Sequence, residues 1–146
     1  MLNESRCDLN DFLYGLFYGT VTKNVYPKGV PTELTESDTK DGFLVVKAGG
    51  ISDMSAFRNQ AYGSVRCFIE VYVPTISRGR YNKTKNRSLE SSVNEVIDNE
   101  IANPSHSDYT IMQDSIVTLD DEEYGNGDNR FMMFIKSFIV TIDSDN

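Results

Sequence analysis

The segment 131–142 near the C-terminus is apolar at almost every position, and it limits the folds open to this chain more than any other feature. Its odd and its even positions both carry large apolar side chains, with one Lys-Ser interruption. Successive side chains of a strand point to opposite faces of a sheet, so such a strand needs cover on both faces. Helices can cover one face, whereas the chain's own long loop or another subunit has to cover the other. Both alternatives are open from the sequence, and the second makes candidate interface residues of Phe131, Met133 and Ile135, or of their neighbours on the opposite face.

Periodicity indicates a further strand and two helices. Segment 65–73 alternates strictly, with five apolar residues on one face and a mixed set on the other. Segments 8–22 and 88–102 carry apolar residues three and four positions apart, which is typical of amphipathic helices. Pro104 follows the second helix, where proline is expected.

The remaining segments complete the order of elements. Residues 43–47 predict a short strand, and residues 109–119 predict a strand with some alternation. Loops or turns are predicted for 25–41, 51–61 (a loop or a single helical turn), 62–63 (a turn or bulge), 78–87 and 120–130.

These segments predict a single α+β domain over residues 1–146, in the order α-β-β-α-β-β. The expected architecture is a two-layer sandwich, with an antiparallel or mixed four-stranded sheet and both helices on one face. A long loop and an extended acidic hairpin complete it. A chain of 146 residues is close to the commonest domain size and can bury a sizeable core.

The composition leaves little room for chemistry. His106 is the single histidine, and Cys7 and Cys67 are the two cysteines, too few for a site built on several histidines or on four cysteines. Ser105, His106 and Asp108 share one loop, whereas the members of a catalytic triad converge from separate segments. We therefore expect no enzyme, no metal site and no cofactor, and we interpret the cysteines as buried thiols in a reducing compartment.

The charge and the N-terminus limit location and partners. Lys and Arg number 14 and Asp and Glu number 22, so the net charge is −8. A field of that sign repels nucleic acid and anionic membranes. The N-terminus lacks the basic-then-apolar pattern of a signal peptide, and the longest apolar run is too short to span a bilayer as a helix. We expect a soluble protein, made in the cytoplasm, without a membrane partner.

Two short segments carry opposite charge. Segment 78–87 holds five basic residues and no acid, and segment 120–123 holds four consecutive acids. The basic segment is a solvated loop, a site for a protein partner or a site for nucleic acid, with Tyr81 placed to stack on a base. The acidic segment fails the spacing of an EF-hand calcium loop and is typical of a hairpin turn on Asn126-Gly127.

The separation of charge leads to a hypothesis of self-assembly. A closed head-to-tail ring places the positive loop of one subunit near the acidic tip of its neighbour. The candidate contact residues are Arg78, Arg80, Tyr81, Lys83, Lys85 and Arg87 on one side, and Asp120, Asp121, Glu122 and Glu123 on the other.

The whole-chain order resembles that of the tail terminator, tail-completion and neck ring proteins of tailed bacteriophages. The resemblance lies in the helix followed by Val25-Tyr26-Pro27, the strand Cys-Phe-Ile-Glu-Val-Tyr-Val at 67–73, the Arg-Gly-Arg-Tyr-Asn loop at 78–82 and the helix Leu-Glu-x-x-Val-Asn-x-x-Ile at 89–97. The resemblance covers nearly the full length of the chain. It concerns the order of the elements and their general residue pattern rather than a diagnostic motif.

The resemblance implies a non-enzymatic virion protein that is assembled in the host cytoplasm. Such subunits form rings of six or twelve copies between the head connector and the tail. Their implied partners are further copies of the same chain, adjacent neck, connector or tail proteins, and DNA passing non-specifically through the channel. Two other readings stay open: a small cytosolic adaptor or regulatory domain, and a metal-dependent enzyme that uses paired carboxylates such as Asp120 and Glu122.

Overall fold

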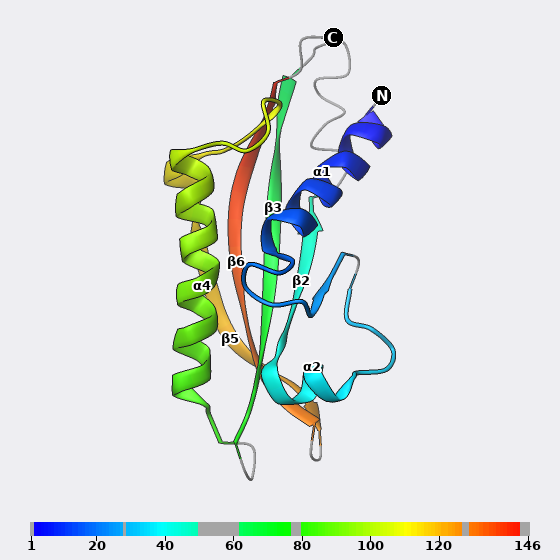
Figure 1. Cartoon of the computed structure of the whole chain (residues 1–146), viewed down its shortest axis with the longest axis vertical. Coiled ribbons are helices and arrows are strands. Elements are labelled where there is room, and N and C mark those ends of the chain that lie inside the picture. The colour runs from blue at the N-terminus through cyan, green and yellow to red at the C-terminus, as the bar shows by residue number, and fades with distance from the viewer. Residues whose placement is uncertain (1, 28, 50–61, 77–79, 127–128, 144–146) are drawn as a thin grey trace.

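Figure 1 shows a computed structural model of the chain, which describes residues 2–27, 29–49, 62–76, 80–126 and 129–143. The elements along the chain are α1 (Leu2–Phe17), β1 (Val25–Tyr26), α2 (Glu36–Asp41), β2 (Phe43–Ala48), β3 (Tyr62–Pro74), α4 (Lys83–Ala102), β4 (Tyr109–Ile111), the 3-10 turn η2 (Gln113–Ser115), β5 (Val117–Asn126) and β6 (Asn129–Asp143).

The described strands form one mixed sheet in the order β1-β2-β3-β6-β4, and β5 also pairs with β6. β3 and β6 are the two long central strands, and they pair antiparallel from Tyr62 opposite Asp143 to Pro74 opposite Phe131. The second edge of β6 is shared, because β4 pairs with residues 140–142 and β5 with residues 129–137. The only parallel pair in this sheet is β1 with β2.

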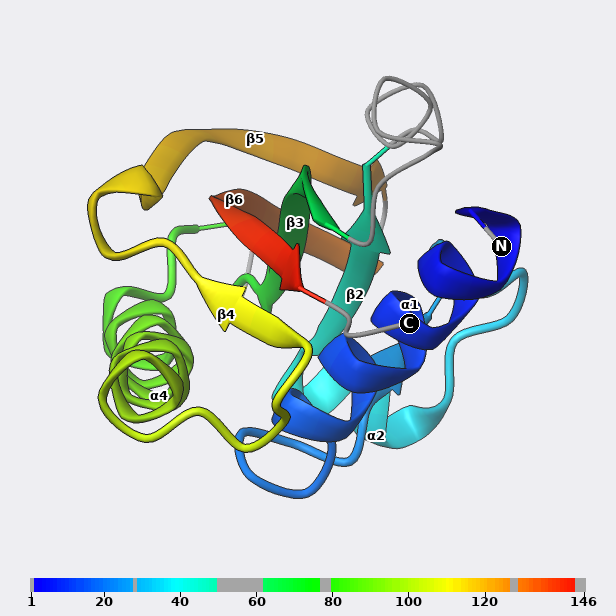
Figure 2. The ribbon, with the colours of Figure 1, turned by 90° about the horizontal axis from the view of Figure 1, so that it is seen from above.

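Helices α1 and α4 lie on the same side of the sheet, as Figure 2 shows from above. Their apolar stripes bury Leu9, Leu13 and Phe17 from α1 and Leu89, Val93 and Ile97 from α4. These side chains pack on one face of β2, β3 and β6 in the main core, which also contains the fully buried Cys67. The predicted α+β sandwich, with both long helices on one face, is confirmed.

The predicted four strands are wrong, because the described residues alone form a sheet of six. The single strand expected at 109–119 is divided into β4, η2 and β5, and most of the turn expected at 120–130 is strand. The cause lies in β6, whose 15 residues present a long edge of backbone N–H and C=O groups. Pairing satisfies those groups, and this tertiary gain overrides the weak strand propensity of the acidic residues.

Helix boundaries also differ from the prediction. The first helix begins at Leu2 and ends at Phe17, not at 8 and 22, and Gly19 follows with a left-handed φ of 79°. The second long helix begins at Lys83, where the Asn82 side chain accepts a hydrogen bond from the backbone N–H of Lys85. The first turn of α4 has no apolar stripe, so the apolar periodicity predicted a start at residue 88, which is too late.

The loop expected at 25–41 contains two short elements, β1 and α2. Thr35 and Asp38 form a capping box at the start of α2, in which each side chain accepts the other's backbone N–H. Residues 62–63, expected as a turn or bulge, are the start of β3. The ambiguous segment 51–61 lies outside the described residues.

Gly42 makes the sharp connection from α2 to β2. Its φ is 88°, a left-handed conformation, and a Cβ built there would lie 2.5 Å from the carbonyl oxygen of Tyr72. Only glycine fits that approach without moving the backbone of β3. Gly15, in contrast, lies within α1 and a Cβ built on it would meet nothing within 4 Å.

These two glycines should respond oppositely to alanine. We expect Gly42→Ala to lower the free energy of unfolding by about 2–4 kcal/mol, because it adds backbone strain and a steric overlap. Gly15→Ala should raise it by about 0.5–1 kcal/mol, because alanine is the better helix former. Urea denaturation followed by circular dichroism measures both changes. A Gly42→Ala protein as stable as the wild type would contradict the tight contact with β3.

Candidate interaction surface

The face of the sheet turned away from the main core is here called the outer face, and its first half is covered by the chain itself. Phe43 and Tyr72 stack with ring centroids 4.4 Å apart, and Phe131 meets Phe43 edge-on at 5.3 Å. A second apolar cluster forms around these rings; it is completed by Val45, Tyr26, Val30, Leu34 and Met133. Phe131 is therefore only 1% exposed, inside a cluster to which residues of the long loop contribute.

The second half of the outer face is open. Leu119 of β5 stands opposite Ile135 of β6, and Val117 stands opposite Ser137, which neighbours Phe68 of β3. Val117 is 46% exposed and Leu119 is 42% exposed. Three partly exposed residues lie on the same face: Phe68, Ile135 and Ile139. We call these three, together with Val117 and Leu119, the open half. Of the three nominated β6 residues, Phe131 is buried, Met133 lies at the margin and Ile135 belongs to the open half.

Polar side chains on the outer face are paired with one another. Glu70 accepts hydrogen bonds from the Lys47 ammonium at 3.0 Å and from the Tyr72 hydroxyl at 2.9 Å. Arg66 donates to the Ser137 hydroxyl at 2.8 Å. Burial, followed by the hydrogen bond to Glu70, raises the pKa of the Tyr72 phenol well above its usual range. The polar groups here are satisfied, so the open half is defined by its apolar side chains.

β5 is held in place by a buried lysine on its other side. Lys136 is only 5% exposed, yet its ammonium lies 2.8 Å from the Glu90 carboxylate of α4 and donates to the Thr118 hydroxyl at 2.6 Å. This arrangement ties α4, β6 and β5 together. The exposed side chains of β5 therefore stand on a firmly attached strand.

The acidic residues lie on β5 and not in a loop at the hairpin tip. Glu122 stands opposite Met133 on the outer face, whereas Glu123 stands opposite Met132 on the other face, and both are exposed. A register shift between Leu119 and Glu122 separates them from the open half. The side chains of Asp120 and Asp121 lie outside the described part of the structure.

The basic residues gather at the start of α4, at the end of the molecule that is lower in Figure 1. Ile76 donates its backbone N–H to the carbonyl of Arg80 at 2.9 Å, and this contact links the end of β3 to the segment before α4. Tyr81 is 44% exposed, Lys83 and Arg87 are exposed, and Lys85 lies 3.8 Å from Asp41. Within the described residues, Lys83 and Arg87 form no ion pair. Arg78 lies outside the described residues.

The predicted basic loop is therefore partly wrong, since Lys83, Lys85 and Arg87 are helical. The structure also adds residues that sequence reasoning missed: Ile76, Val117 and Leu119 are exposed apolar side chains. Strict alternation at 117–119 was the signal available for the last two. The acidic residues that follow favour a turn, so this alternation was not interpreted as the start of a longer strand.

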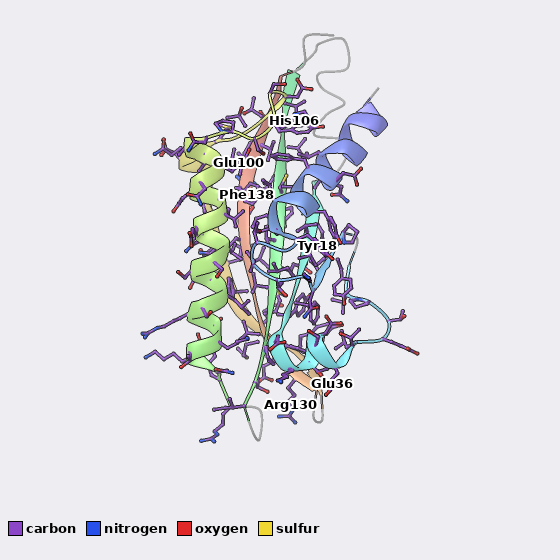
Figure 3. The ribbon with its side chains drawn as sticks, viewed as in Figure 1. Tyr18, Glu36, Glu100, His106, Arg130 and Phe138 are labelled. Carbon is purple, nitrogen blue, oxygen red and sulfur yellow. The ribbon has the colours of Figure 1, made fainter. Side chains whose placement is uncertain are left out.

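No catalytic or metal-binding arrangement appears among the described residues. His106 lies at the opposite end of the molecule from Arg130 (Figure 3), where its ring packs 4.7 Å from that of Tyr109. Its Nδ1 accepts the backbone N–H of Asp108 at 3.1 Å. In the described ranges no group of three or more His, Cys, Asp or Glu side chains is placed to hold a metal ion.

Comparison of the chain with protein-family models, with curated proteins and with solved structures found no match. Among the helices described, none combines the length and the apolar character needed to cross a membrane.

Tyr26 provides a pH-dependent test of the covered half. Its hydroxyl donates to Asp38 Oδ2 at 2.6 Å, and burial, followed by this hydrogen bond, raises the phenol pKa from 10.0 to about 12. Between these two values the unfolded chain loses this proton while the folded chain keeps it. The contribution is therefore complete below pH 10 and declines as pH rises towards 12.

We expect alkaline unfolding of Tyr26→Phe to show a shallower loss of stability across that range than the wild type. At neutral pH the variant should be less stable by about 1 kcal/mol, the usual net value of one hydrogen bond. Urea denaturation at a series of pH values measures both. An unchanged slope between pH 10 and 12 would show that the phenol is not protected by the covering loop.

Proposed function

We propose that this chain is a structural, self-assembling subunit: a non-enzymatic ring protein of the neck or tail of a tailed bacteriophage, placed between the head connector and the tail. The observation that carries the proposal is the open half of the outer face. Val117 and Leu119 present exposed apolar side chains on a strand that the Lys136 contacts hold in place. Contiguous exposed apolar surface of this kind favours a site of protein contact.

β5 is also protected against unspecific pairing. Among the described strands it pairs with β6 alone, so its second edge is open. Exposed acidic side chains and the register shift after Leu119 are the devices that discourage edge-to-edge aggregation. A strand that presents apolar side chains on its face and whose open edge carries acidic side chains and a register shift supports association through the face, with a defined partner.

The phage assignment rests on the resemblance in element order, and the two-layer α+β architecture is consistent with it. On this proposal the partners are further copies in a ring of six or twelve, the adjacent neck, connector or tail proteins, and DNA that passes through the channel. The location is the virion, after assembly in the host cytoplasm. The net charge of −8 suits such a passage, because an acidic wall does not retain DNA.

A small adaptor or regulatory domain is the second candidate, because the open half also suits a different protein as its partner. The two candidates differ in oligomeric state: a ring subunit associates with itself, whereas an adaptor does not. The metal-dependent enzyme gains no support from the described carboxylates, since Glu122 and Glu123 point to opposite faces of β5.

We expect Val117→Thr combined with Leu119→Thr to weaken self-association about tenfold or more, because the change removes apolar contact surface and keeps strand-forming side chains. Light scattering coupled to size-exclusion chromatography, over a concentration series, measures the assembled mass. Tyr18→Ser is the matched control, since Tyr18 is a similarly exposed aromatic residue just after α1. A wild-type chain that stays monomeric at every concentration, with no rings in negative-stain images, would refute the ring proposal.

A further inference from the structure

The exposed large apolar side chains of the described residues fall largely into two groups of opposite charge. Seven such side chains are exposed, and five of them belong to these groups. We name one group the basic knob: Ile76, Arg80, Tyr81, Lys83 and Arg87. We name the other the acidic strand: Val117, Leu119, Glu122, Glu123 and Tyr124.

The basic knob is held by hydrogen bonds at both ends of its apolar part. Thr75 donates its backbone N–H to the carbonyl of Arg130 at 3.0 Å, which fixes the chain against the start of β6. Ile76 donates to Arg80, and Asn82 caps α4 directly after Tyr81. Ile76 is 43% exposed despite these constraints. The knob thus presents two apolar side chains beside cations, and hydrogen bonds hold the chain on either side of them.

The acidic strand has the matching character. Val117 and Leu119 provide its apolar surface, and Tyr124 adds a ring that meets Tyr72 edge-on at 5.1 Å and is still 39% exposed. Glu122 and Glu123 provide the negative charge, and in the described residues no cation lies within ion-pair distance of either. One surface is apolar and basic, and the other is apolar and acidic.

We propose that the acidic strand and the adjoining open half are covered by the basic knob of a second copy of this chain. The inference rests on the proposed self-assembly and names the two surfaces that meet. Burial of Ile76 and Tyr81 against Val117 and Leu119 removes apolar area from water on both copies. Lys83 and Arg87 then lie near Glu122 on the same face, and Glu123 on the other face of β5 adds to the negative field, which selects this pairing over others.

Charge disfavours the simpler two-fold dimer in which the acidic strands of two copies pack on each other. Two acidic strands packed on each other bring the glutamates of both copies together, and like charges at such a contact are destabilising. The contact between strand and knob uses different surfaces on the two copies. It therefore repeats from copy to copy, and closes into a ring where the rotation allows.

The two surfaces lie on opposite edges of β6. β3 leads into the knob and pairs with one edge of β6, whereas β5 pairs with the other edge. The knob lies at the end of the molecule that is lower in Figure 1, whereas Val117 and Leu119 stand opposite Ser137 and Ile135, nearer the middle of β6. The contact therefore joins different parts of the two copies.

A pair of charge-reversed variants tests the assignment. The first carries Lys83→Glu and Arg87→Glu, and the second carries Glu122→Lys and Glu123→Lys. Each alone should self-associate about tenfold more weakly or worse, because one side of every contact is reversed. An equimolar mixture should assemble again, because alternating copies restore opposite charges at every contact. Native mass spectrometry identifies the alternating composition, and the rescue should weaken as salt is raised.

Matched variants control for net charge and folding. Lys23→Glu with Lys40→Glu, and Glu33→Lys with Glu95→Lys, make the same charge changes at exposed positions elsewhere and should assemble as the wild type does. The first test variant places acids in the opening turns of α4, where the helix dipole favours them, so loss of fold should not explain its behaviour. Circular dichroism of each variant checks this directly.

The outcomes separate this inference from the proposed function. A wild-type chain that never associates overturns both. A wild-type chain that assembles, with either test variant unaffected or with no rescue in the mixture, overturns only the assignment of the two surfaces. Binding of double-stranded DNA that is lost in Lys83→Glu/Arg87→Glu, while assembly is unchanged, assigns the knob to DNA and also overturns the inference.

Discussion

The structure depends on the need of β6 for cover on both faces. This strand is apolar on each side and pairs with β3 from Phe131 to Asp143. Its other edge is satisfied by two separate strands, β4 and β5. The rest of the chain follows from this requirement, because a half-covered β6 in water loses the apolar burial that drives folding.

The chain meets the requirement unequally on the two faces. Helices α1 and α4 cover most of the inner face of β6, and Tyr26, Val30 and Leu34 pack against the rings around Phe43 on part of the outer face. The hydrogen bond from Tyr26 to Asp38 and the Thr35 capping box hold that cover in place. What remains uncovered is the open half beside β5, and this is the surface that we propose for self-assembly. The polar pairs around Glu70 mark the boundary between the two regions.

Much of the architecture was predictable because it follows from local periodicity. The alternation at 65–73, the apolar segment 131–142 and the helical stripes correctly indicated β3, β6, α1 and α4, with both helices on one face. The errors lie where long-range pairing overrides local preference. Acidic residues 120–123 read as a turn, yet the free edge of β6 draws them into β5. The early start of α4 depends on the Asn82 cap, and β1 exists only because β2 lies beside it.

The candidate interaction surface divides in the same way. By itself the sequence determined that β6 needs two covers and that opposite charges are concentrated in two short segments, because both facts are properties of residue type and spacing. Only the tertiary structure decided that Phe131 is buried in the second apolar cluster while Leu119 is exposed. It also decided that the basic and acidic segments flank β6 towards one end of the molecule. The physical reason is that exposure and proximity depend on which strand edges and faces the distant parts of the chain occupy, and no local pattern specifies that.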